Sequence, residues 1–138
     1  MHVQENIQPL LRFFAANITA DTDTSVVSIA DAHAVRVVAH VGTVSGSNVI
    51  RVFVNTTNST NGATELTAKA TPTLASDNSY EIFVTGEEAI TALPGAAYLF
   101  VRVDVGGSSP SVPIAIDVSA YPARRVPATL PTGWTRII

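Results

Sequence analysis

The stretch that decides the fold is Tyr98-Leu-Phe-Val-Arg-Val-Asp-Val105. Every second residue from Leu99 onward is apolar, whereas Arg102 and Asp104 are charged and lie between apolar neighbours. Side chains alternate sides along a β-strand, so this stretch predicts a strand with one apolar face and one polar face. The glycine- and serine-rich segment 106–110 follows it and predicts a turn.

The same alternation recurs along the chain. Val112-Pro-Ile-Ala-Ile-Asp-Val118 predicts a second strand, in which Pro113 must lie at an edge or a non-bonded position because it has no N–H. A segment over 86–93 predicts one or two helical turns, which Pro94-Gly95 ends. About six or seven short strands without βαβ spacing predict an all-β fold, an antiparallel β-sandwich of the jelly-roll or Ig-like kind. The other strands that we expect are 26–29, 34–41, 49–54, 80–84 and a weaker one over 66–70.

Both ends of the chain differ from this middle. Residues 7–14 are apolar before the first strand begins, and residues 121–138 contain three prolines and the only tryptophan. Dense prolines keep a segment extended. The two ends are therefore either arms that contact a neighbouring molecule or segments that pack on their own sandwich. We expect an N-terminal arm over 1–20, a β-sandwich domain over 21–120 and an extended C-terminal arm over 121–138.

The charge is unevenly distributed along the chain. The net charge is −3, which is too small to require a nucleic-acid partner. All acidic residues lie at or before Asp117, whereas 119–138 carries three arginines and no acid. This pattern favours docking on a neighbour, or a tail that folds back on its own acidic domain. No apolar run approaches the ~20 residues of a membrane span, and Met1–Asn6 shows no signal-peptide pattern.

No motif predicts catalysis or metal binding. The chain has no cysteine, which excludes disulfides and thiolate zinc sites. His33 and His40 lack the spacing of metal ligands, and Asp21-Thr-Asp23 lacks the glycine and glutamate of a calcium loop. Glu87-Glu88 starts the predicted helix, where the helix dipole favours acids. We therefore expect no enzymatic activity, no cofactor and no small-molecule substrate.

The order of these pieces resembles that of the capsid decoration proteins, or cement proteins, of tailed-bacteriophage heads. The resemblance covers most of the chain and consists of strand order and style, without a ligand motif. It is carried by Gln8-Pro-Leu-Leu11, Ser25–Ile29, Asp31–Gly42, Val49–Thr57, Ala97–Val105, Val112–Val118 and Tyr121-Pro-Ala-Arg-Arg125.

This resemblance implies a virion protein that is assembled in the host cytoplasm and lies on the capsid exterior. Such a protein binds the major capsid protein, bridges its subunits and associates with itself as a homotrimer, without a nucleic-acid or membrane partner. Aromatic, aliphatic and arginine side chains of the two arms are the candidate contacts, because such groups carry much of the energy of an interface. They are Leu10, Leu11, Phe13, Phe14, Arg124, Arg125, Trp134, Arg136, Ile137 and Ile138.

Two alternatives remain open from the sequence. One is another phage structural component of similar build, such as a head–tail connector or a tail protein. The other is a carbohydrate-binding or adhesion sandwich, which needs exposed aromatic residues over a groove. Tyr80, Tyr98 and Trp134 are too few and too dispersed to predict such a groove.

Overall fold

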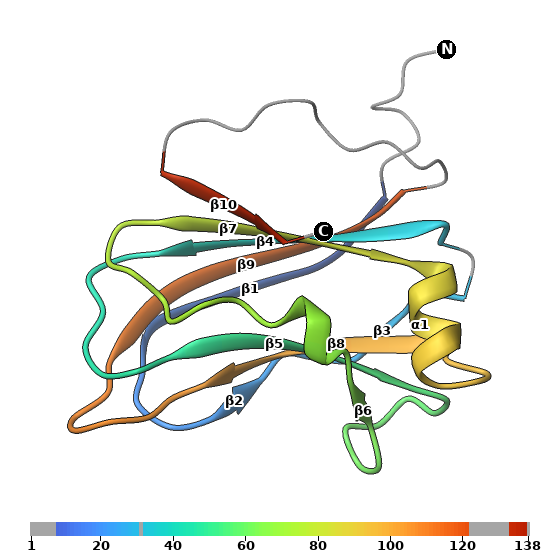
Figure 1. Ribbon diagram of the computed structural model, residues 1–138, viewed down its shortest axis with the longest axis horizontal. Coiled ribbons are helices and arrows are strands. Elements are labelled where there is room, and N and C mark those ends of the chain that lie inside the picture. The colour runs from blue at the N-terminus through green and yellow to red at the C-terminus, as the bar shows by residue number, and fades with distance from the viewer. Residues whose placement is uncertain (1–7, 31, 122–132, 138) are drawn as a thin grey trace.

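The computed structural model describes residues 8–30, 32–121 and 133–137 of the chain. Two β-sheets lie one on the other, with the only α-helix of the described residues at one end of the pair (Figure 1). This arrangement confirms the predicted all-β sandwich.

Sheet A has five strands in the order β1-β9-β4-β7-β10. Neighbouring strands are antiparallel, except that β10 runs parallel to β7. The first strand, which the sequence places in the N-terminal arm, is therefore an edge strand of sheet A. The bounds are β1 (Gln8–Ile18), β9 (Val112–Tyr121), β4 (Ala34–Val41), β7 (Ser79–Thr85) and β10 (Trp134–Ile137).

Sheet B contains the strand formed by Tyr98–Asp104, and its strand pairs are all antiparallel. Its strand order is β2-β8-β5-β6, and β3 also pairs with β8. The bounds are β2 (Thr22–Asp23), β8 (Tyr98–Asp104), β5 (Val49–Asn55), β6 (Thr64–Glu65) and β3 (Val27–Ser28).

The core lies between the two sheets and follows the alternation of the strands. In β8, Leu99, Val101 and Val103 are completely buried, as predicted, while Arg102 and Asp104 point to the other side. The matching inward residues of sheet A are Val35, Val37, Ala39 and Val41 of β4, Tyr80, Ile82 and Val84 of β7, and Ile114, Ile116 and Val118 of β9.

Two local structures lie between β5 and β8. The predicted helix is α1 (Gly86–Ala92), which begins with a capping box between Thr85 and Glu88. The weak strand predicted over 66–70 was wrong, because Thr67–Lys69 forms the 3₁₀-helix η2. In η2 the backbone turns, and Lys69 N donates to the carbonyl of Leu66 at 2.9 Å. This turn leaves the Lys69 side chain buried.

Pro113 lies in β9, an inner strand, where the ladder with β4 stops. The last pair of that ladder is Val41 with Ile114. One residue beyond, Gly42 N donates to the carbonyl of Pro113, and the carbonyl of Gly42 accepts from Asp77 N instead of from β9. Pro113 is therefore at a non-bonded position, as its missing N–H predicts.

Candidate interaction surface

The outer face of sheet A is the side of the sheet that points away from sheet B. Since the odd-numbered residues of β4 point into the core, its even-numbered residues point outward. The same alternation applies to the other strands of the sheet. The outward side chains that define this face are Arg12 and Phe14 of β1, Asp117 of β9, Arg36, Val38 and His40 of β4, Glu81 of β7, and Trp134 and Arg136 of β10.

An ion triad lies at the centre of this face. The Glu81 carboxylate is completely buried and accepts a hydrogen bond from Arg36 Nε at 2.6 Å and from Arg136 Nε at 2.8 Å. Each oxygen of the carboxylate thus receives one guanidinium. A buried carboxylate is tolerated only when it is paired in this way. The triad therefore joins β10 to β7 and β4 through charge as well as through backbone pairing.

The C-terminal strand makes further contacts around the triad. The Trp134 ring meets the His40 ring edge-on, with 5.1 Å between the centroids. His40 Nδ1 is also 2.8 Å from Ser79 Oγ, and Asn78 Nδ2 donates to Thr135 Oγ1 at 3.1 Å. Residues 134–137 are therefore a docked strand of the sandwich.

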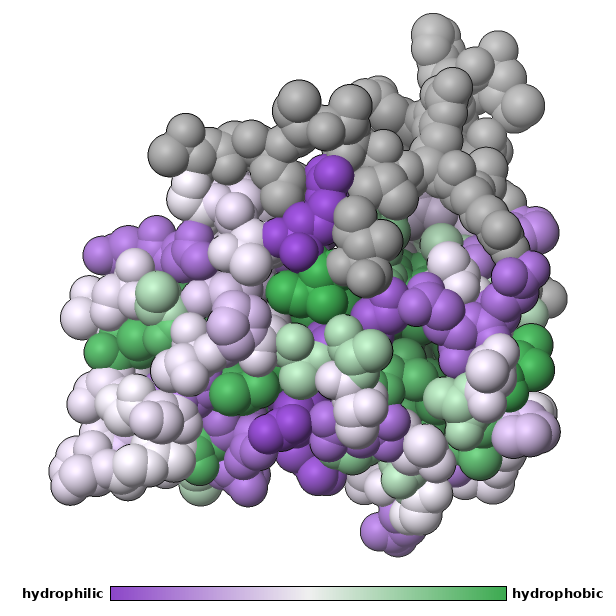
Figure 2. Space-filling view, in the orientation of Figure 1, coloured by the Kyte–Doolittle hydropathy of each residue, from purple (hydrophilic) through white to green (hydrophobic). Residues whose placement is uncertain are grey.

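Two hollows lie on the outer face of sheet A. The larger is a groove of about 690 Å³ that Arg36, His40 and Trp134 line together with parts of β1 and β9. The second is an apolar trough of about 460 Å³ beside Phe14, with Gly42, Pro113 and Ala115 among its other walls. Phe14 itself is 76% exposed. Figure 2 shows that hydrophobic residues on the face in view form small patches separated by hydrophilic and neutral ones.

The outer face of sheet B is closed by its own interactions. Arg102 forms two hydrogen bonds to Asp23, at 2.6 and 3.1 Å, and its guanidinium lies 4.5 Å above the Phe53 ring. Arg51 bridges Asp104 and Glu65. Hydrogen bonds from these arginines to their carboxylates raise the pKa of both guanidinium groups, although partial burial opposes this shift. These polar groups already have partners within the sheet.

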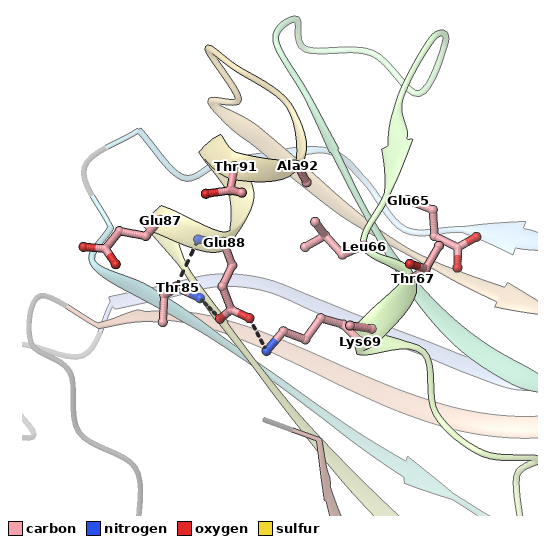
Figure 3. Close-up of a pocket in the computed structure, with 10 residues that line it drawn as sticks. Glu65, Leu66, Thr67, Lys69, Thr85, Glu87, Glu88, Thr91 and Ala92 are labelled. Carbon is pink, nitrogen blue, oxygen red and sulfur yellow. Dashed lines mark hydrogen bonds and ion pairs between the residues drawn. The ribbon is translucent and has the colours of Figure 1, made fainter.

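An open pocket of about 450 Å³ lies between η2 and α1 (Figure 3). The buried Lys69 reaches across it, with Nζ 2.6 Å from Glu88 Oε2. Burial raises the pKa of Glu88, but hydrogen bonds from Lys69 and Thr85 outweigh burial, so the pKa lies below its ordinary value. The charged pair therefore links η2 to α1 across this pocket.

The predicted contact residues fall into three groups. Leu10, Leu11, Phe13 and Ile137 are partly buried and pack on the core, whereas Phe14, Trp134 and Arg136 lie on the outer face of sheet A. Arg124, Arg125 and Ile138 lie outside the described residues. The triad partners Arg36 and Glu81 were not among the contact residues predicted from the sequence. A signal for them existed, because they are residues of opposite charge within the largely apolar strand patterns of 34–41 and 80–84.

Among residues 8–30, 32–121 and 133–137, no three His, Asp or Glu side chains gather where they could hold a metal ion. In these ranges no helix is long and apolar enough to cross a membrane. Tyr80 is buried, and its hydroxyl accepts from Ala75 N at 2.8 Å, so this ring is not available to stack on a sugar.

No family model matches the sequence, and no curated protein matches it. Among solved structures, the chain is similar to a chain from the cryo-EM structure of Broad Bean Stain Virus, with 9% identity and a TM-score of 0.36 over 72% of this chain and 64% of that one. It is also similar to a chain of infectious bursal disease virus Gx strain, with 10% identity and a TM-score of 0.33 over 86% of this chain and 32% of that one. The chain thus spans less than two thirds of either neighbour. At these TM-scores the likenesses carry no conclusion about function.

Proposed function

We propose that this protein is a structural component of a virion, a decoration protein that binds the outer surface of an icosahedral bacteriophage capsid. It stabilises the shell by bridging major capsid protein subunits. The observation that carries the proposal is the order of strands and loops, which resembles that of capsid decoration proteins and which folds into a two-sheet sandwich. The proposal assigns no reaction to the protein.

The sandwich has the properties that such a role requires. Its buried charges, such as Glu81 and Lys69, are paired across strands and helices, which makes a rigid body. The outer face of sheet A offers a groove of about 690 Å³, with two arginines, a histidine and a tryptophan on its walls. These residue types are common in protein interfaces. We assign this face to the shell.

Many equal contacts account for stabilisation of a shell. A modest affinity at each site adds up when one rigid body contacts two subunits at once. The resemblance also implies a homotrimer, which would multiply the contacts again. The mass of the protein in solution tests this oligomeric state. A head–tail connector of similar build is distinguished by its copy number, because a connector is a single ring of about six to twelve copies.

Co-sedimentation with purified shells tests this proposal. Wild-type protein pellets with the shells and saturates at a fixed number of copies per capsid subunit. Ser119→Glu places a long charged side chain in the groove that Ser119 lines, directly opposite Arg36 in the β4–β9 ladder, and we expect it to abolish pelleting without lowering the melting temperature. Ile90→Glu is the matched control, since Ile90 is 56% exposed on α1, outside that groove. Equal pelleting of both variants would exclude the groove, and wild-type protein that stays in the supernatant would exclude the proposed function.

A further inference from the structure

Strand β1 has a strand neighbour on one side only within the described residues. Gly42 N donates to the carbonyl of Pro113, and His33 N donates to the carbonyl of Tyr121. The odd-numbered residues of β9 therefore direct their backbone N–H and C=O groups toward β4. The even-numbered residues of β9 therefore direct theirs toward β1. Their partners on β1 are Leu11, Phe13 and Ala15.

It follows that Arg12 and Phe14 direct their N–H and C=O groups away from the sheet. Within the described residues, these backbone groups of Arg12 and Phe14 have no hydrogen-bond partner. Unpaired edge groups of this kind are a template for another strand. The ends of β1 are unsuitable for a ladder, because the pairing is irregular between Pro9 and Leu11 and again between Ala15 and Ile18. The usable edge is the regular segment from Leu11 to Ala15.

The side chains on this segment are also unusually open. Phe14 is 76% exposed, and it is one of only two exposed large apolar residues in the described ranges. The Arg12 side chain is 88% exposed, although it forms an ion pair of 3.0 Å with Asp117. The apolar trough lies beside Phe14. An aromatic ring and a cation are thus presented two residues apart on an edge whose backbone groups pair with no described strand.

We infer that β1 pairs with β1 of a second copy of this chain, antiparallel and about a two-fold axis through Phe13. In this register the backbone of Arg12 bonds to that of Phe14 of the second copy, and the reverse, each pair exchanging both hydrogen bonds. The two sheets A join into one continuous sheet. On its outer face each Arg12 guanidinium lies against the Phe14 ring of the other copy, as a cation–π pair.

The strand itself specifies the second copy and the register. Phe13 is the middle residue of Gln8–Ile18, so this register gives the longest overlap of β1 with itself. Sliding by two residues in one direction places Arg12 opposite Arg12, which is repulsive. Sliding in the other direction places Phe14 opposite Phe14 and leaves the cation without a ring. A two-fold contact of this kind is isologous and separate from the contact that builds a trimer.

Disulfide trapping tests the register, because the natural chain has no cysteine. Arg12→Cys and Phe14→Cys are made separately at exposed positions and mixed under mild oxidation. Directly paired residues in an antiparallel ladder are about 5.5 Å apart at Cα, which suits a disulfide. We expect a covalent dimer in the mixture and none in either variant alone. A dimer of Phe14→Cys alone would overturn the register, and absence of a dimer from the mixture would overturn the pairing.

A charge pair of variants tests the same contact without oxidation. Phe14→Lys faces Arg12 of the second copy and repels it, whereas Phe14→Glu faces the same arginine and attracts it. By light scattering we expect Phe14→Lys to lose half of the wild-type mass and Phe14→Glu to keep it. Loss of mass in both variants, or in neither, would overturn the inference.

The outcome is independent of the proposed function. Pairing through β1 is measured on the free protein, and shell binding is measured by co-sedimentation. A protein that forms the cross-linked dimer but ignores shells contradicts only the proposed function. A protein that binds shells and gives no cross-link contradicts only the pairing of β1.

Discussion

Replacing Glu81 by glutamine tests the idea that the ion triad docks the C-terminal strand. The substitution keeps the size of the side chain and removes its charge. Arg36 and Arg136, which donate to its two oxygens at 2.6 and 2.8 Å, then face each other without a counter-charge. Within the described residues, the buried Nη2 of Arg136 already has no hydrogen-bond partner.

The magnitude follows from the burial of the three groups. Removing one partner of a buried pair costs about 3–5 kcal/mol. The side chains of Arg36 and Arg136 are 26% and 15% exposed, so water relieves part of this cost. We therefore expect the lower end of that range, about 3 kcal/mol, which corresponds to a drop of roughly 10 °C in melting temperature for a chain of this size.

Tryptophan fluorescence is the natural assay, because Trp134 is the only tryptophan and lies on the strand that the triad holds. In Glu81→Gln, we expect the emission of Trp134 to shift to the red at a lower urea concentration than the concentration at which circular dichroism detects loss of β-structure. Arg12→Gln is the control, since it breaks an ion pair on the same face whose side chains are 88% and 43% exposed. Such an exposed pair contributes about 0–1 kcal/mol. If Glu81→Gln melts within 2 °C of the control, the triad does not hold β10.

Three further predictions concern other parts of the fold. Glu88→Gln removes the counter-charge of the buried Lys69, while the glutamine oxygen can still accept from Thr85 N in the capping box, and should cost roughly 1–3 kcal/mol in urea denaturation at pH 7. Because folding lowers the pKa of Glu88, the wild-type advantage is present above the ordinary carboxyl pKa and is lost as the pH falls through the folded value, so the two proteins converge in acid. Gly46→Ala should destabilise by more than about 1 kcal/mol in thermal unfolding, because φ is +89° and the new Cβ lies 2.5 Å from a carbonyl oxygen. Phe14→Ser should change the unfolding free energy of the monomeric protein by less than about 0.5 kcal/mol, because the ring is 76% exposed.

The sequence was sufficient to predict the sandwich, because its strands alternate clearly. Leu99, Val101 and Val103 show the period of two that a half-buried strand requires, and the structure buries all three. Local pattern failed at Lys69, where a short apolar context suggested a strand. There a residue far away in the sequence, Glu88, forms an ion pair with the buried ammonium group of Lys69 and so favours the 3₁₀-helix over a strand.

The candidate surface was harder to predict, because it is assembled from distant parts of the chain. Arg36 and Glu81 are 45 residues apart, and Glu81 and Arg136 are 55 residues apart. Only the pairing of β4, β7 and β10 brings them together. The apolar character of Trp134 and Ile137 did indicate a docked segment, but nothing in the sequence identifies β7 as its neighbour or parallel as its direction.

A cryo-EM map of the assembled particle tests the central claim most directly. The account predicts two-sheet density of this shape repeated over the outside of the shell, with the outer face of sheet A against major capsid protein subunits and each copy touching more than one of them. Density confined to a single vertex or to the tail, or a shell exterior without it, would contradict the account.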